Sequence, residues 1–166
     1  GSAPTASFTG TPTSVCVGDT VTFTDNSTGN PTSSQWTFTG GTPSSSSAGT
    51  ALVVYNTPGS YTVRLISSNA VGSDTSTQVN YITVNANPTV SLSSFSAVCS
   101  NSGSFALSGG SPVGGTYSGT GVSGGNFNPS TAGVGSHTIT YSFTNGSGCT
   151  STATENIAVN ASPTVS

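Results

Sequence analysis

The stretch TITYSF at residues 138–143 alternates hydroxyl-bearing and apolar side chains without a break. Because successive side chains of a β-strand point to opposite faces, this period of two places the apolar residues on a core face and the hydroxyls outside. The stretches VTFT (21–24) and YTVRL (61–65) alternate in the same way. No window shows helical periodicity, since glycine or proline interrupts each candidate. We therefore predict an all-β, antiparallel fold with essentially no helix.

Strand-like segments recur about every 8–12 residues, separated by Gly, Pro, Asn and Ser, as in β-sandwiches and barrels. Charge is nearly absent, because Lys and Arg total 1 and Asp and Glu total 4 in the 166 residues. A hydroxyl-rich chain with so little charge could be disordered. Its aromatic residues, however, stand among Val, Ile and Thr in alternating order, which favours a folded β-structure.

The scarcity of basic residues excludes whole classes of partner. Nucleic-acid binding needs several Lys or Arg contacts to phosphates, and Arg64 is the only Lys or Arg in the chain. The same shortage removes electrostatic attraction to anionic membrane surfaces. No apolar run approaches the roughly 18 residues of a spanning helix, so we expect no membrane insertion. No basic-then-apolar leader opens the chain, and Gly1-Ser2 is either native or a remnant of cloning.

One eight-residue phrase occurs twice, as VNANPTVS at residues 84–91 and as VNASPTVS at residues 159–166. Each copy ends a strand-like segment and continues into a short Asn/Ala turn. Pro88 and Pro163 then mark a linker and open the next module, because proline suits the first residue of an edge strand. The repeat therefore predicts a tandem array.

On this basis we expect one module at residues 1–86 and a second at residues 87–161. Residues 162–166 are then the start of a further module or an inter-subunit tail. Such a short tail buries too little to be ordered alone. We expect Val165 to contact either the next module or another copy of the chain, by strand addition to a sheet edge.

Four motifs follow one another in the first half: GDTVTF (18–23), WTFTGGTP (36–43), Tyr55 with PGSYTV (58–63), and NAVG (69–72). In these motifs, which cover most of residues 4–85, the first half resembles an Ig-like domain of the PKD (polycystic kidney disease) type. Many members carry aspartates in the turn where this chain has Thr37 and Gly40, so no ion-binding role of those carboxylates is carried over. The GGTP form resembles that of secreted proteins of gliding, particle-degrading bacteria.

Glycine-rich phrases carry a second resemblance: LSGGSP (107–112), GGTYSG (114–119), GV (121–122), FNP (127–129), AG (132–133), TITY (138–141) and GC (148–149). In these phrases the second half resembles an Ig-like repeat of bacterial secreted and cell-surface adhesins. Together the two resemblances imply tandem Ig-like β-sandwiches at the cell surface or outside the cell. They imply a role as a spacer, in display or in adhesion, and they imply no catalytic activity.

The second resemblance also implies a disulfide, because the family often pairs cysteines placed like Cys99 and Cys149. Closing that roughly 50-residue loop would contribute about 4 kcal/mol in the chain-entropy model. The bond would imply an oxidising, extracellular setting. Cys16 is left over as a free thiol, and we expect either a buried small hydrophobe or an intermolecular link.

Two sequence patterns typical of cofactor-binding or catalytic loops occur, but neither has the neighbouring structure or residues that such a site requires. GTGVSG (119–124) fits a dinucleotide loop, but no helix is expected to follow it, and a chain with 22 glycines produces chance matches. GVSGG (121–125) fits a nucleophile elbow, but His137 and Glu155 would be the only available partners. The cysteines and the histidine lack metal-site spacing. We therefore predict no catalytic residue, cofactor or metal, and no enzyme.

Four residues are candidate glycosylation sites. Thr20 and Thr75 follow aspartate as in the Asp-Ser/Thr acceptor of such surface bacteria, and Asn26 and Asn145 begin N-x-S/T sequons. Surface glycans would keep a chain with so little charge soluble. The alternative, that hydrated Ser, Thr and Asn side chains suffice, stays open.

For the two cores we expect these residues: Trp36, Phe38, Tyr55 and Tyr61 in the first, and Phe105, Tyr117, Ile139 and Tyr141 in the second. The function predicted is a non-enzymatic structural module of a secreted bacterial fibre, stalk or large cell-surface adhesin. Its partners would be neighbouring modules or copies of the same chain. The alternative is a carbohydrate- or ice-binding module. The outward threonines look like isolated pairs, such as those at 22/24 and 138/140, which does not favour ice.

Overall fold

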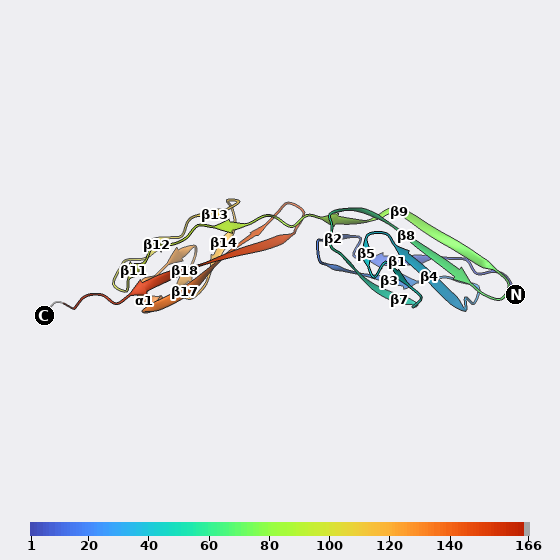
Figure 1. Cartoon of the computed structure of the whole chain (residues 1–166), viewed down its shortest axis with the longest axis horizontal. Helices are drawn as coiled ribbons and strands as arrows, with labels where there is room; N and C mark the ends of the chain where they lie inside the picture. Colours follow the sequence, from blue (N-terminus) through green and yellow to red (C-terminus); the bar gives the residue numbers. More distant parts are fainter. Residues whose placement is uncertain (165–166) are drawn as a thin grey trace. The chain divides into compact units, whose positions relative to one another are not determined.

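The computed structural model describes residues 1–164, and the expected contact of Val165 lies outside them. The chain divides into two compact units, Gly1–Ala86 and Asn87–Ser166 (Figure 1). Strands dominate both units, so the prediction of an all-β fold is confirmed. No helix within the described part of the chain is long and apolar enough to cross a membrane.

Two sheets form the first unit. One has the strand order β1-β3-β7-β5, and the other has the order β2-β9-β8-β4-β6. All pairings within them are antiparallel except that of β2 with β9, which is parallel. The bounds are β1 Phe8–Thr11, β2 Ser14–Cys16, β3 Thr20–Asp25, β4 Ser33–Phe38, β5 Gly41–Thr42, β6 Ser45–Ser46, β7 Thr50–Tyr55, β8 Gly59–Ser68 and β9 Ser73–Asn85.

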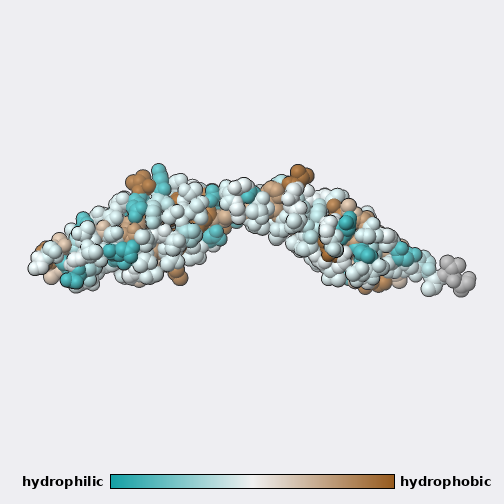
Figure 2. All heavy atoms as spheres, turned by 180° about the vertical axis from the view of Figure 1, so that it is seen from behind, coloured by the Kyte–Doolittle hydropathy of each residue, from teal (hydrophilic) through white to brown (hydrophobic). Residues whose placement is uncertain are grey.

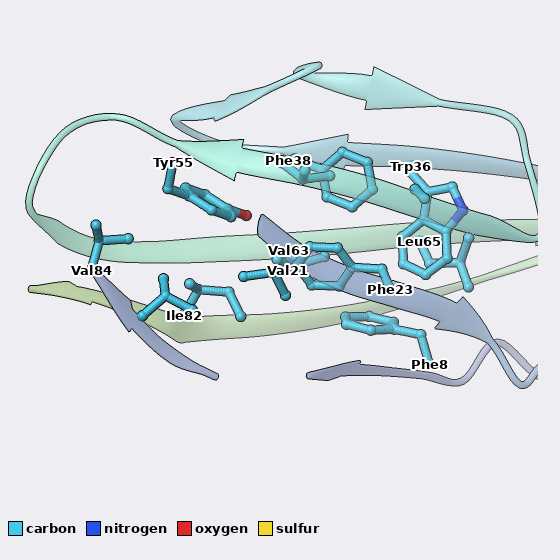
Figure 3. Close-up of a cluster of buried hydrophobic side chains, with 13 residues drawn as sticks. Phe8, Val21, Phe23, Trp36, Phe38, Tyr55, Val63, Leu65, Ile82 and Val84 are labelled. Atoms are coloured by element: carbon cyan, nitrogen blue, oxygen red, sulfur yellow. The ribbon is translucent and has the colours of Figure 1, made fainter. Parts of the chain in front are cut away.

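Alternating residues of both sheets fill the first core (Figure 3). Trp36 and Phe38, two apart on β4, are fully buried and stack with ring centroids 5.4 Å apart. The Trp36 indole Nε1–H donates to the Ala48 carbonyl at 2.8 Å, which satisfies its one polar atom. Tyr55 is fully buried, and Tyr61 lies partly buried beside it with ring centroids 5.1 Å apart.

The two glycines of the GGTP motif allow these rings to approach the backbone. Gly40 has φ +72°, and a Cβ atom there would lie 2.1 Å from Tyr61 Cε1. A Cβ atom on Gly41 would lie 2.4 Å from Val53 Cγ1. The turn therefore requires glycine at residue 40 for both conformation and space, and at residue 41 for space alone. An aspartate at Gly40 would meet the same obstruction.

In the second unit, the residues described up to Thr164 form three sheets, with the strand orders β11-β18-β17-β14, β12-β16-β15 and β10-β13. Its longest pairing is the antiparallel hairpin of β17 and β18, whereas β11 pairs with β18 in parallel. The bounds are β10 Ser91–Leu92, β11 Val98–Cys99, β12 Phe105–Ala106, β13 Gly110–Ser111, β14 Thr116–Ser118, β15 Val122–Ser123, β16 Asn126–Phe127, β17 Gly135–Thr144 and β18 Thr150–Asn160.

Tyr141 and Ile139 of β17 are buried in the second core, where Phe105 and Tyr117 are partly buried. The Tyr141 hydroxyl accepts a hydrogen bond from Gly115 N at 2.8 Å and donates one to the Pro112 carbonyl. A Cβ atom on Gly115 would lie 2.5 Å from Tyr141 Cζ. The glycine-rich phrases of this unit thus make room for a buried tyrosine.

One short helix, α1 (Pro129–Ala132), is present, although essentially no helix was expected. The Asn128 side chain accepts hydrogen bonds from the backbone N–H groups of Ser130 and Thr131, at 3.1 and 3.4 Å. Proline at the first helical position completes a local start signal that needs no hydrophobic periodicity. The FNP motif therefore specifies one helical turn.

Candidate functional site: the terminal strand pairs and the hydroxyl face

Each unit ends in a parallel pairing that carries one copy of the repeated phrase, and we call these pairings the terminal strand pairs. In the first unit, β2 pairs with the end of β9, so that Val15 lies opposite Val84 and Cys16 lies opposite Asn85. Both valines are buried. Val17 N donates to the Asn85 carbonyl at 3.1 Å, and Asp19 N donates to the Cys16 carbonyl at 3.0 Å.

The terminal strand pair of the second unit repeats this arrangement. Here β11 pairs with the end of β18, so that Val98 lies opposite Val159 and Cys99 lies opposite Asn160. Ser100 N donates to the Asn160 carbonyl at 2.9 Å, and Ser102 N donates to the Cys99 carbonyl at 3.0 Å. Cys16 and Cys99 therefore occupy equivalent positions. The sequence carried a signal for this, a Val-Cys dipeptide in each half, which sequence reasoning missed.

Within the first copy of the phrase, the chain enters the core of the second unit. Pro88 is half-buried and lies outside any strand, Val90 packs against the second core, and β10 starts at Ser91. Within the second copy, Ser162 Oγ lies 3.0 Å from Ser100 Oγ and accepts a hydrogen bond from Asn101 N at 3.1 Å.

The two residues that follow Ser162 lie outside any strand: Pro163 and Thr164 are both exposed. The structure describes no residue beyond Thr164.

The expected disulfide between Cys99 and Cys149 is wrong. Cys99 is an exposed free cysteine, whereas Cys149 is buried and disulfide-bonded. Cys99 lies opposite Asn160, at one end of β18, and Cys149 directly precedes Thr150, at the other end. The 11 residues of β18 span more than 30 Å at about 3.3 Å per residue, far beyond the roughly 4–7 Å between the Cα atoms of a disulfide.

The expectation of a free thiol at Cys16 is also wrong, because this residue is disulfide-bonded. Cys16 is half-buried at the end of β2, where its backbone N–H donates to Asp19 Oδ2 at 2.9 Å. Of the three cysteines, Cys99 is thus the one that remains as a thiol.

A second candidate surface is an array of polar side chains on the outer side of β14, β17 and β18. Register places Ser118, Thr140 and Thr154 in one row across the three strands, and Thr116, Ser142 and Thr152 in the next. The outward threonines of β17 therefore belong to a continuous surface and are not isolated pairs. We call this surface the hydroxyl face, and it consists of Thr116, Ser118, Thr138, Thr140, Ser142, Thr150, Thr152, Thr154 and Asn156.

Residues of intermediate hydropathy cover most of the surface seen in Figure 2, between scattered hydrophilic and hydrophobic ones. Near β14 there is a hollow of about 380 Å³, lined by Gly115, Thr116, Tyr117, Gly124 and Gly125. Its one aromatic residue, Tyr117, is partly buried and accepts a hydrogen bond from Gly110 N at 2.9 Å. The hollow contains no acid, base or metal ligand among these lining residues.

The groups named in the two catalytic patterns are not brought together as a site. The GTGVSG stretch spans β15 and its flanking turns, within a hairpin that β15 forms with β16. His137 Nε2 lies 2.8 Å from the Gly133 carbonyl, and Glu155 lies opposite Ile139 within the β17–β18 hairpin. Across the described residues, no group of three or more His, Cys, Asp or Glu side chains could hold a metal ion.

The four candidate glycosylation residues lie on different parts of the surface. Thr20 on β3 and Thr75 on β9 are exposed. Asn26 is exposed, and its Nδ2 donates to Thr9 Oγ1 at 3.0 Å. Asn145 is half-buried, and its Oδ1 accepts hydrogen bonds from Ser147 N and Cys149 N, both at 3.0 Å. A glycan on Asn26 would replace one existing hydrogen bond.

Two titratable groups of the first unit have shifted pKa values. Burial raises the pKa of Asp25, but hydrogen bonds from the Ser27 and Ser34 hydroxyls and from Ser27 N outweigh it and leave the pKa below its usual value. Burial, with a smaller effect of Tyr61, raises the pKa of Tyr55 to about 12. The Tyr55 hydroxyl has no hydrogen-bond partner among the described residues. Both shifts follow from local packing and indicate no catalytic role.

Comparison with solved structures finds proteins that are similar to this chain. The PKD1 domain of the Vibrio cholerae metalloprotease PrtV shares 31% identity, covering 50% of this chain and 98% of that domain with a TM-score of 0.41. A carbohydrate-binding module of the β-sandwich superfamily shares 24% identity over 86% of this chain and 55% of its own, with a TM-score of 0.45.

An adhesin of an Antarctic bacterium that binds ice shares 15% identity, covering 98% of this chain and 49% of its own, with a TM-score of 0.45. No curated protein matches the chain significantly. The family model described as "PKD domain" matches residues 1–84, which is half of the chain. The chain therefore belongs to the PKD domain family.

Proposed function

We propose that the chain is a non-enzymatic structural segment of a secreted bacterial fibre, stalk or large cell-surface adhesin. The observation that carries this proposal is the repeated phrase together with its geometry. In both units the phrase begins at the end of the last strand, in a terminal strand pair, and within its first copy the chain enters the core of the next unit at Val90. A phrase that joins one module to the next and is then repeated is what a tandem array requires.

Three features support an extracellular setting for this array. PKD domains typically work outside the cell, two cysteines are disulfide-bonded, and disulfides persist in oxidising compartments. The chain also offers little acid–base chemistry, because it has one histidine and four acidic residues. In this proposal its partners are neighbouring modules or copies of the same chain, with surface glycans at sites such as Thr20 and Asn26.

The experiment is carried out on material from the source cells. Antibodies raised against residues 1–164 are expected to label extended structures outside the cell in electron microscopy. Limited proteolysis of those structures should release fragments that begin in the segment between Ala86 and Ser91, because this segment has no strand pairing. Labelling confined to the cell interior, or to discrete particles without repeats, would contradict the proposal.

A second function, binding to a carbohydrate or to ice, is favoured by one observation, the continuous hydroxyl face. Neutral hydroxyl rows on a sheet can hydrogen-bond to ordered hydroxyls or water without any charged group. The test is a pair of lysine variants, Thr140→Lys and Thr154→Lys. The matched control is Thr77→Lys, at an exposed position of β9 in the first unit. Retention on a polysaccharide matrix, or incorporation into growing ice, should fall only for the first two variants. Equal behaviour of all three would dismiss this function.

A further inference from the structure

The equivalence of Cys16 and Cys99 extends beyond the residue type. Each cysteine follows a valine, lies opposite the asparagine of the repeated phrase in a parallel pairing, and is the first residue of a four-residue turn closed by the same hydrogen bond. The residue after each cysteine donates its N–H to that asparagine's carbonyl. Two positions with the same register and the same printed backbone hydrogen bonds point their side chains to the same face of the strand pair.

The two equivalent cysteines nevertheless differ in their covalent state. Cys16 is disulfide-bonded, and Cys99 is exposed and free. Cys149 is disulfide-bonded as well, so no cysteine of this chain is left for Cys99. A partner for Cys99 must therefore come from outside these 166 residues.

We propose that Cys99 forms a disulfide with a cysteine of a further Ig-like module, the one entered through the second copy of the phrase. This inference rests on the proposed array. The bonded state of Cys16 shows that this position of the module can form a disulfide. The second copy of the phrase repeats the Pro-Thr-Val-Ser of the first copy, whose serine is the first residue of β10.

The exposure of Cys99 fits a link that forms when the next module is present. An exposed free thiol in an oxidising compartment is reactive, and an odd cysteine in a secreted protein points to a link outside the chain. Each of the two thiols loses its proton and the pair loses two electrons as the S–S bond forms. A thiol oxidase that carries its own disulfide accepts those electrons and becomes a dithiol.

The native test is non-reducing peptide mapping of the extracellular material. The peptide that carries Cys99 is expected to be linked to a cysteine peptide absent from residues 1–166. A free Cys99 thiol in native extended structures would overturn this inference and leave the proposed array intact. A symmetrical link between two Cys99 peptides would also overturn it, since the partner would then be a second copy of this chain.

A second test supplies the missing module to the full chain. Residues 92–166 are appended after Ser166, so that the second copy of the phrase leads into the same sequence as the first copy does. After oxidative expression, a maleimide should label Cys99 in the 166-residue chain but not in the extended chain. In the extended chain Cys99 should be linked to the appended counterpart of Cys149, which is the bonded cysteine of the second unit.

The extended chain contains its own controls. The appended counterpart of Cys99 has no module after it and should stay labelled at the level seen in the 166-residue chain. Changing the appended counterpart of Cys149 to serine should restore labelling of Cys99, and a Cys99→Ser variant shows that folding does not depend on the thiol. Full labelling of Cys99 in an extended chain whose appended module resists protease would refute the inference.

Discussion

Replacing Gly40 by alanine should destabilise the first unit through two separable effects. Gly40 has φ +72°, a conformation that raises the energy of a residue with a Cβ atom by about 1–2 kcal/mol. The new Cβ atom would lie 2.1 Å from Tyr61 Cε1. The Tyr61 ring cannot move away easily, because its hydroxyl donates to the Thr57 carbonyl at 2.8 Å and its ring packs against Tyr55.

Overpacking of this kind costs about 1–3 kcal/mol, so Gly40→Ala should lower the free energy of unfolding by roughly 2–5 kcal/mol in total. Gly18→Ala is the matched control, since Gly18 has φ +92° and no atom within 4 Å of a Cβ position. It should show the conformational cost alone. Gly49→Ala, which has neither a positive φ nor a close neighbour, should be neutral or slightly stabilising.

The assay is urea unfolding followed by tryptophan fluorescence. Trp36 is the only tryptophan of the chain and is fully buried in the first core, so its emission reports the first unit specifically. Equal losses for Gly40→Ala and Gly18→Ala would refute the role of the Tyr61 ring. A double-mutant cycle with Tyr61→Leu provides a second check, because the Gly40→Ala cost should shrink when the ring is absent.

Three further predictions concern single groups. Tyr55→Phe removes a buried hydroxyl without a partner among the described residues, so the unfolding free energy should be unchanged or rise by about 1 kcal/mol. Because the folded pKa of Tyr55 is about 12, its contribution in the wild type should be lost between pH 10 and 12, and this loss should be missing in the variant. Asp25 has a folded pKa below its ordinary value of 3.8, so its contribution to the free energy of unfolding is present above pH 3.8 and is lost as the pH falls through the folded pKa. Ser34→Ala removes one of the hydrogen bonds that lower this pKa and should weaken the acid dependence of stability, measured by unfolding from pH 6 to pH 2. Thiol labelling of the native 166-residue chain should modify Cys99 alone, and labelling of all three cysteines without reductant would contradict the bonded state of the other two.

Local alternation was sufficient to predict which side chains are buried in the long strands. Phe23, Trp36, Ile139 and Tyr141 all lie at positions where the period of two places a core residue, and all four are buried. This works because side-chain direction in a strand depends on the chain itself and not on its neighbours.

Features that depend on register were not predictable in the same way. The disulfide expectation failed because Cys99 pairs beside Asn160 and not beside the start of β18, which no local pattern encodes. The hydroxyl face was missed for the same reason, since the row from Ser118 through Thr140 to Thr154 exists only after three strands are aligned. Register is determined by the whole sheet and its turns.

The parallel direction of the terminal strand pairs has a mechanical consequence. In a parallel pair, tension that pulls the beginning of one strand and the end of the other in opposite directions acts along both strands. The bonds from Thr83 N to the Thr13 carbonyl and from Val17 N to the Asn85 carbonyl, 2.8 and 3.1 Å long, then bear the force together in shear. An antiparallel pair pulled from its open end would lose its bonds one at a time. In the first unit, where β1 precedes β2, tension that reaches β2 from its N-terminal side and leaves through the end of β9 therefore acts where the hydrogen bonds must break simultaneously.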